Sequence, residues 1–275
     1  MKIIPGLYER VIDQHLLSLL QSLPKERVEQ EALDTAESHL VLAQYTAVLV
    51  ARALERLPSE ERLTHQVALC NDIIQLLAKN ASGAVVREDQ IAEITHQRLL
   101  SIRQPPIAGQ IALLPRPETP LALSSLLTGT RVDPSLVSQL RTELKTTDRL
   151  DILCSFIKWS GIRILEEELL AFTARSESRL RIITTSYMGA TDVKAVEFLR
   201  ELPRTEIKLS YDTQRTRLHA KAYMFHRETG FGTAYVGSSN LSHAALTEGL
   251  EWNVKLSQYE AAHLWEKIGA TFEAY

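Results

Sequence analysis

Apolar residues in the first hundred positions recur every three or four residues, which is the period of helices that bury one face. Leucine clusters lie at 16–20 and again between 40 and 49. Helix-ending and capping residues such as Pro24 separate the clusters, and a last helical pattern spans 87–102. Residues 1–103 are therefore predicted to form an all-helical N-terminal region.

Prolines dominate the segment that follows. Five of them fall between Gln104 and Pro120. Proline lacks an amide hydrogen and fixes its own backbone angle, so neither a helix interior nor a central strand tolerates this density. We expect an extended linker over 104–133.

Beyond the linker the period changes. A helical pattern at 134–145 leads into short apolar runs that alternate with helical stretches, the signature of an α/β sheet with parallel members. A hairpin, a short helix, a strand and a last helix complete the pattern. The last helix reaches Tyr275 without a capping signal, which predicts that the chain is cut from a longer protein. The expected strands are 150–157, 180–187, 207–211, 218–225, 233–236 and 252–256, and the expected helices between and after them are 163–173, 193–202, 241–247 and 259–275.

These patterns together predict an α/β fold over 134–275, a mixed sheet flanked by helices. Composition narrows the function classes. The net charge is -3 and the sequence pI is about 6.3, so any contact with nucleic acid must be local. Cys70 and Cys154 are too few for a disulfide framework and are expected to be buried free thiols. Without an apolar run long enough to span a bilayer or a secretory signal, a cytoplasmic location with no membrane partner is expected.

Chemistry is concentrated near the C-terminus, in His219-x-Lys221, Gly237-Ser238-x-Asn240 and Glu251. These residues supply a nucleophile, a cation, two neutral donors and an orienting anion. Alternate residues of a strand share a face, so Arg217, His219 and Lys221 are expected to project into one pocket. The set is typical of phosphodiester chemistry without a metal or a cofactor.

Each residue type suits one step of that chemistry. His219 can attack phosphorus and form a phosphohistidine, provided that an acceptor such as Glu251 holds its other ring nitrogen. Lys221 and Asn240 can neutralise the non-bridging oxygens of the phosphate. A further group must protonate the leaving oxygen. A single chain has one such motif and therefore lacks a second histidine to act as this acid.

A plainer interpretation exists for each motif by itself. His-x-Lys often lies on a surface strand without any role, and the serine and asparagine of Gly-Ser-x-Asn often cap a following helix. Finding both in order, each beside a strand-like run and with Glu251 just downstream, favours the functional interpretation.

At these residues the sequence resembles the phospholipase D superfamily, and in particular the nuclease branch found N-terminal to bacterial superfamily 2 helicases. The resemblance implies that His219, Lys221, Ser238, Asn240 and Glu251 are catalytic and that two copies of the motif meet across a twofold axis. A homodimer would then supply the second histidine, with Glu251 orienting the first. The segments that carry the resemblance are 184–189 (TTSYMG), 217–222 (RLHAKA), 236–242 (VGSSNLS) and 249–253 (GLEWN).

The sequence departs from the superfamily at one position, where His226 replaces the motif's aspartate. Because that aspartate is regarded as structural, its loss argues little against activity, although it makes lipid transphosphatidylation less expected. His226 itself is interpreted as a strand-end residue rather than a metal ligand.

Four further residues are candidates for substrate binding. Arg215 and Arg217 precede the motif and could bind flanking phosphates. Gly237 lies beside the catalytic serine. Lys158 follows the first strand, at the sheet end where α/β proteins often bind ligands.

Three functions follow. The first is a nuclease module acting on DNA, coupled to a helicase domain in a longer protein. The alternative is a catalytically inactive module with the same fold that binds nucleic acid or dimerises. A lipid phosphodiesterase is the third, and no interfacial helix supports it.

Overall fold

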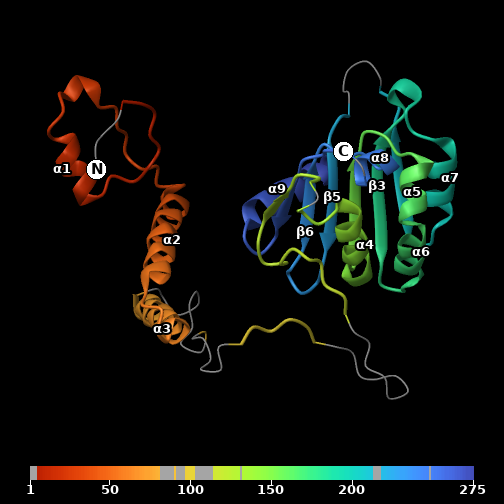
Figure 1. Cartoon of the computed structure of the whole chain (residues 1–275). Helices are drawn as coiled ribbons and strands as arrows, with labels where there is room; N and C mark the ends of the chain where they lie inside the picture. Colours follow the sequence, from red (N-terminus) through yellow and green to blue (C-terminus); the bar gives the residue numbers. More distant parts are fainter. Residues whose placement is uncertain are drawn as a thin grey trace. The chain divides into compact units, whose positions relative to one another are not determined.

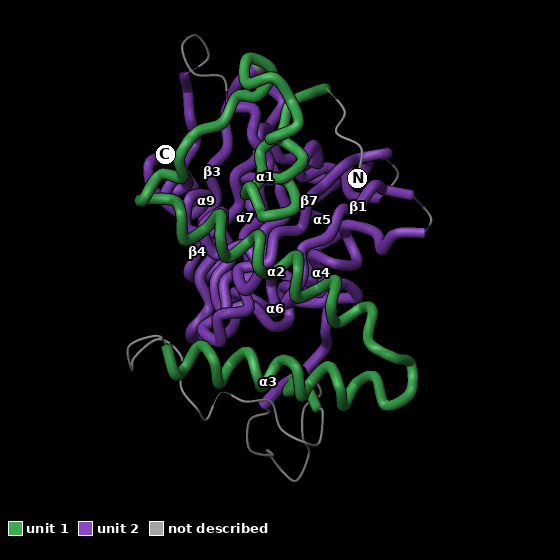
Figure 2. The backbone as a smooth tube through the Cα atoms, turned by 90° about the vertical axis from the view of Figure 1, so that its left-hand side faces the viewer, with its two compact units in different colours: residues 1–100 green, residues 101–275 purple. Residues whose placement is uncertain are grey.

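The computed structural model divides into two compact units, residues 1–100 and 101–275 (Figure 2). The described residues are 5–80, 90, 97–102, 114–130, 132–212, 218–247 and 249–275.

The first unit contains the helices α1 (Gln14–Leu20), α2 (Ser38–Arg56) and α3 (Arg62–Asn80), which confirms helices ahead of the sheet. Asp13 caps α1, because its carboxylate accepts a hydrogen bond from the amide of Leu16 at 2.7 Å. Neither α2 nor α3 has a buried residue. Some of their apolar side chains, among them Val41 and Tyr45, are partly buried.

The helix expected over 87–102 is described at few of its positions. Gln90 lies in a 3-10 helix and residues 97–102 form no helix, whereas 81–89 and 91–96 lie outside the described residues. The apolar period at the end of this stretch therefore did not predict a helix correctly.

The second unit is built on a seven-stranded mixed sheet (Figure 1). On one side of the sheet the strands run parallel, β2 to β3 and β3 to the edge strand β4, as the alternation of strands and helices predicts. The remaining neighbours are antiparallel. The strand order is β1-β7-β6-β5-β2-β3-β4. The strands are β1 (Ser125–Leu127), β2 (Arg149–Cys154), β3 (Arg179–Thr185), β4 (Thr205–Ser210), β5 (Lys221–His226), β6 (Thr233–Gly237) and β7 (Asn253–Ser257).

Helices cover both faces of this sheet (Figure 1). Alternate strand residues point to opposite faces, so Tyr223 and Phe225 join the large core cluster with residues of α4 to α8. Ala222 and Met224 pack instead against α9. The helices are α4 (Leu136–Thr146), α5 (Trp159–Ile164), α6 (Glu166–Ala174), α7 (Val193–Glu201), α8 (His243–Thr247) and α9 (Ala262–Ala274), with a short 3-10 turn at Tyr187–Gly189.

The second half of the segment expected to be a linker is built into the sheet. β1 pairs antiparallel with β7 at the edge. The Thr119 hydroxyl accepts a hydrogen bond from Lys255 Nζ at 3.0 Å, and the Ser257 hydroxyl donates to the carbonyl of Leu121 at 2.7 Å. The prolines of this segment do not prevent the pairing, because β1 itself contains none and keeps all its amide hydrogens.

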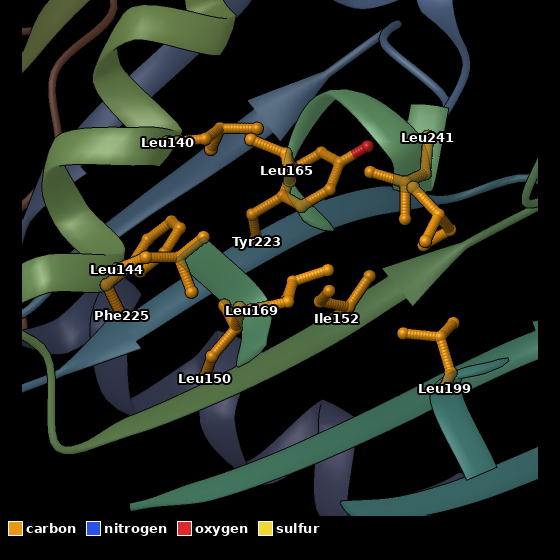
Figure 3. Close-up of a pocket in the computed structure, with 11 residues that line it drawn as sticks. Leu140, Leu144, Leu150, Ile152, Leu165, Leu169, Leu199, Tyr223, Phe225 and Leu241 are labelled. Atoms are coloured by element: carbon orange, nitrogen blue, oxygen red, sulfur yellow. The ribbon is translucent and has the colours of Figure 1, made fainter. Parts of the chain in front are cut away.

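The large core contains a gap of about 10 Å³ (Figure 3). Its lining is apolar apart from the Tyr223 hydroxyl, and the volume is about that of one water probe. This is a packing gap without room for a substrate. The eleven side chains around it come from the strands and from the helices on one face, including Leu140, Ile152, Leu199, Tyr223 and Leu241.

Two further observations bear on the expectations from composition. Both cysteines are free, Cys154 buried and Cys70 partly exposed. No helix in the described ranges is long and apolar enough to cross a membrane.

Candidate functional site

The motif segments meet at one end of β5, β6 and β7. Antiparallel pairing places Ala222 opposite Val236 and Gly237 opposite Asn253, so the start of β5, the end of β6 and the start of β7 are neighbours. β2 ends at the same place, with Cys154 opposite Lys221. Residues that are far apart in the chain thereby share one sheet end.

His219 and Lys221 contact each other, although not in the way that strand alternation predicts. β5 begins at Lys221, and His219 precedes it in irregular backbone. Lys221 Nζ lies 3.0 and 3.3 Å from the two ring nitrogens of His219 and donates to the carbonyl oxygen of His219 at 2.7 Å. His219 is exposed, whereas Lys221 is 5% exposed. The pair thus presents an accessible imidazole backed by a buried cation.

The lysine is electrostatically unusual. Burial lowers the pKa of Lys221, because removal from water disfavours the charged amine, and the nearby charge of Glu251 partly opposes this. A cation held in this way can interact more strongly with a phosphate than a solvated surface lysine can.

Ser238 and Glu251 form a second contact pair. The Ser238 hydroxyl donates a short hydrogen bond to the Glu251 carboxylate and accepts one from the amide of Trp252 at 3.1 Å. The Ser238 amide donates to the carbonyl of Trp252 at 3.1 Å. Among the described residues no hydrogen bond joins Glu251 to the His219 ring, so the orienting role of Glu251 stays a prediction. In this structure the Glu251 carboxylate accepts the hydrogen bond from Ser238 instead.

The side chain of Asn240 is held in place through its amide oxygen, Oδ1. Its Oδ1 accepts from the amide of Phe156 at 3.4 Å and from the thiol of Cys154 at 3.6 Å. Both donors come from the end of β2. Because these contacts occupy the oxygen of the side-chain amide, its Nδ2 hydrogens are left to serve as donors toward a bound anion.

A buried polar layer supports these loops, and sequence reasoning largely missed it. The Tyr223 hydroxyl donates to the carbonyl of Ser239 at 2.9 Å, and Asn253 Nδ2 donates to the Ser239 hydroxyl at 2.8 Å. Cys154 Sγ accepts from the amide of Leu241 at 3.3 Å. We call Cys154, Tyr223, Ser239 and Asn253 the support layer. Of these four, Asn253 is the one whose spacing gave a signal, because it lies two residues after Glu251 and alternate residues of a strand share a face.

Gly237 has a steric reason for being glycine. A Cβ atom there would lie 2.1 Å from the carbonyl oxygen of Trp252 and 2.6 Å from Asn253 Oδ1. Any side chain would therefore push β6 away from β7 at the point where Ser238 leaves the sheet. The structure gives Gly237 a role in strand packing, and its assignment to substrate binding stays a prediction.

The other candidates for substrate binding differ in what the structure shows. Lys158 lies near the site, because its amide donates to the carbonyl of Leu241 at 2.9 Å, but its Nζ pairs with Asp192 at 3.1 Å. Arg215 and Arg217 lie outside the described residues.

His226, at the end of β5, belongs to a charged network instead of the site. Its Nε2 lies 2.7 Å from Asp151 Oδ2, and Arg181 binds the same carboxylate with two nitrogens at 2.6 and 2.7 Å. Burial raises the pKa of Asp151, but the hydrogen bonds from Arg181 and His226 outweigh it and bring the pKa to about 2. Among the described residues no group of three or more His, Cys, Asp or Glu side chains could hold a metal ion.

Comparison with protein families gives a match over part of the second unit. Residues 140–272 are similar to the family described as "Cardiolipin synthase, PLD-like domain". The matched range contains all five residues predicted to be catalytic. No curated protein sequence matches the chain significantly.

Solved structures give a coarser likeness. NucT from Helicobacter pylori has 15% identity and a TM-score of 0.42, over 55% of this chain and 94% of that one. The phospholipase D family member Nuc from Salmonella typhimurium has 19% identity and a TM-score of 0.39, over 55% and 93%. Polyphosphate kinase from Porphyromonas gingivalis has 15% identity and a TM-score of 0.39, over 62% and 31%.

Proposed function

We propose that this chain is a phosphodiesterase that cleaves DNA without a metal, through a phosphohistidine intermediate. The observation that carries the proposal is the pairing of an exposed imidazole, His219, with the buried cation of Lys221 at the sheet end where Ser238, Asn240 and Glu251 also lie. An accessible nucleophile, fixed donors and a carboxylate in one place match the needs of phosphoryl transfer.

The first step is attack by a ring nitrogen of His219 on phosphorus. A P–N bond forms, the bond from phosphorus to the leaving oxygen breaks, and that oxygen takes a proton from an acid. Lys221 and the Asn240 amide bind the non-bridging oxygens, whose charge grows as the nucleophile approaches. In the second step water attacks phosphorus, the P–N bond breaks and His219 is regenerated.

The acid that protonates the leaving oxygen must be a group other than His219 of the same chain. His219 is the one histidine that the described residues place beside Lys221, and it serves as the nucleophile. The partner subunit's His219 would complete the site in a homodimer, protonating the leaving oxygen and then activating the water. Glu251 stabilises the serine beside it and, once substrate binds, the imidazolium that develops.

DNA is the proposed substrate because the segments around the motif resemble the helicase-associated nuclease branch. In a longer protein a helicase domain would follow and deliver the strand. Since the chain has a net charge of -3, Arg215, Arg217 and Lys158 would provide a local cationic path for the flanking phosphates.

The test is cleavage of single-stranded and double-stranded DNA and of RNA in EDTA across a range of pH. Wild type should cut DNA, His219→Ala should not, and His263→Ala, an exposed histidine on α9, should cut like wild type. Denaturation in alkaline detergent during turnover, under which a P–N bond survives, should trap DNA bound to the chain, and His219→Ala should trap none. Absence of cutting by wild type under every condition would overturn the proposal.

The inactive module gives a different result in the same assay. It predicts salt-sensitive DNA binding without cleavage, in which Lys221→Ala lowers the salt dependence and His219→Ala changes little. A lipid phosphodiesterase would instead release a headgroup from phospholipid vesicles and leave DNA intact.

A further inference from the structure

The loop that carries Asn240 packs against the end of β2 and the first turn of α5. The Leu241 carbonyl accepts a hydrogen bond from the amide of Lys158 at 2.9 Å, and Leu241 forms a parallel bridge with Ile157. A Cβ atom on Gly161 would overlap the carbonyl group of Leu241, so a glycine is needed for α5 to approach the loop this closely. The backbone next to Asn240 therefore has a fixed position.

Cys154, the last residue of β2, joins this backbone to the Asn240 side chain. Its sulfur accepts a hydrogen bond from the amide of Leu241 at 3.3 Å, and the thiol donates toward Asn240 Oδ1 at 3.6 Å. The carbonyl of Phe156 at 3.1 Å and the Tyr223 hydroxyl at 3.9 Å also lie beside the sulfur. Cys154 is fully buried, and burial raises the pKa of its thiol. The sulfur therefore keeps its proton and remains a donor.

These neighbours decide which way the Asn240 amide is turned. A backbone N–H can only donate, so the Asn240 atom that faces the amide of Phe156 at 3.4 Å must be the oxygen. A thiol that donates from Cys154 selects the oxygen as well. The opposite orientation would present the amide oxygen to a phosphate and repel it. Contacts at the end of β2 thus keep the two Nδ2 hydrogens of Asn240 for a bound anion.

We propose that Cys154 is a positioning residue for phosphodiester cleavage, and that its thiol holds Asn240 in the orientation that presents Nδ2 to the phosphate. The proposal rests on the proposed function, in which Asn240 binds a non-bridging oxygen. Because Cys154 is fully buried, it acts through Asn240 and not on the substrate. The competing interpretation is that Cys154 only fills space, since it also belongs to the large core cluster.

Two substitutions of Cys154 separate these interpretations. Cys154→Ala and Cys154→Ser both shorten the side chain, but only serine keeps a donor and an acceptor. We expect turnover of bis(p-nitrophenyl) phosphate to fall about tenfold in Cys154→Ala and only about threefold in Cys154→Ser. If the thiol merely fills space, serine should do no better than alanine, because its hydroxyl brings a polar group into an apolar core. Urea unfolding shows that each variant is folded.

The matched control for truncation is Ile152→Ala. Ile152 lies two residues before Cys154 on β2 and belongs to the same core cluster. Its truncation should lower the free energy of unfolding, because it leaves a cavity, and turnover should stay near the wild-type value.

Binding of inorganic phosphate gives a measurement that needs no cleavage. Isothermal titration calorimetry should show that Asn240→Ala and Cys154→Ala each weaken phosphate binding about fivefold. The double variant should bind no more weakly than Asn240→Ala alone, because residues that act through one contact are not additive. Cys154→Ser should lie between Cys154→Ala and wild type.

The outcomes separate the positioning role from the proposed function. Equal losses in Cys154→Ala and Cys154→Ser, or additive losses in the double variant, would overturn the positioning role even if the chain cleaves DNA. An equal loss of turnover in Ile152→Ala would also overturn it, because the effect would then belong to the core in general. Conversely, the expected order of phosphate affinities in a chain that cuts no DNA would support the positioning role and contradict the proposed function. A wild type that neither binds phosphate nor cuts DNA would overturn both.

Discussion

Two lysines are buried in the same sheet, but the groups that they contact differ. Lys221 is 5% exposed and Lys255 is fully buried. Lys255 donates to the Thr119 hydroxyl and to the carbonyl of Pro120, and the buried charges of Glu143 and Arg227 lie nearby. Lys221 instead contacts the exposed ring of His219. A buried cation enclosed by protein acceptors is part of the packed fold, whereas one facing an accessible imidazole can contact a bound anion.

The surroundings of Lys255 show how a closed network differs from a site. Glu143, fully buried on α4, accepts hydrogen bonds from Arg227, Thr233 and Tyr235. Burial raises the pKa of Tyr235 well above its usual range. These groups are enclosed by α4 and the sheet, so the network has no open position for a substrate.

The strongest test of this comparison is loss of the charge at each lysine. Lys221→Met should lower the turnover of a phosphodiester by about 1000-fold, because a preorganised cation at the phosphate is removed. It should leave the free energy of unfolding nearly unchanged, since a buried charge with few partners stabilises little. Lys255→Met should keep turnover within about twofold. Steady-state kinetics and urea unfolding of both variants measure this, and equal losses of turnover would remove the distinction.

The next effect is on stability alone. Glu143→Ala should lower the free energy of unfolding by about 4 kcal/mol, because it leaves Arg227 buried without its carboxylate. Urea unfolding measures the change, and Glu197→Ala, a substitution on α7 outside this network, is the control. A loss below about 1 kcal/mol would show that the network around Lys255 is more open to water than its burial indicates.

A smaller effect should appear in the pH dependence of stability. Burial lowers the pKa of Lys255 to about 8, from 10.5. Between these values the unfolded chain binds more protons than the folded chain, so the free energy of unfolding should rise as pH increases from 8 to 10.5, by about 2 kcal/mol. Lys255→Met should remove this rise, and urea unfolding of both proteins at several pH values gives the difference. Parallel curves for the two proteins would contradict the lowered pKa.

The smallest effect tests the support layer of the site. Asn253→Ala removes the hydrogen bond to Ser239, so the loop that carries Ser238 and Asn240 should lose its fixed position. Turnover should fall about tenfold, with KM for the diester rising less than turnover falls. Asn253→Asp keeps the shape but not the donor and should behave like alanine. Asn253→Ser should keep its activity only if the new hydroxyl hydrogen-bonds to the Ser239 hydroxyl, as Asn253 does. Unchanged turnover in the alanine variant would show that Asn253 serves strand packing only.

The sequence predicted most of the second unit because its signals are local. The changes of period marked strands and helices from α4 to α9, and the alternation of strands with helices predicted the parallel pairing of β2, β3 and β4. It placed the start of β5 at Leu218 instead of Lys221, because apolar residues before a strand resemble the strand itself. The helix over 87–102 failed in its described part for a related reason: a period by itself does not supply a packing surface.

The sequence by itself determined which residues are candidates for the chemistry, since residue types and their spacing can be read along the chain. Only the tertiary structure decided which of them touch. In it Cys154 contacts Asn240, Ser238 hydrogen-bonds to Glu251, and His226 pairs with Asp151. It also joined β1 to β7 at the edge of the sheet. These contacts depend on strand order and register between distant segments, which local periodicity does not encode.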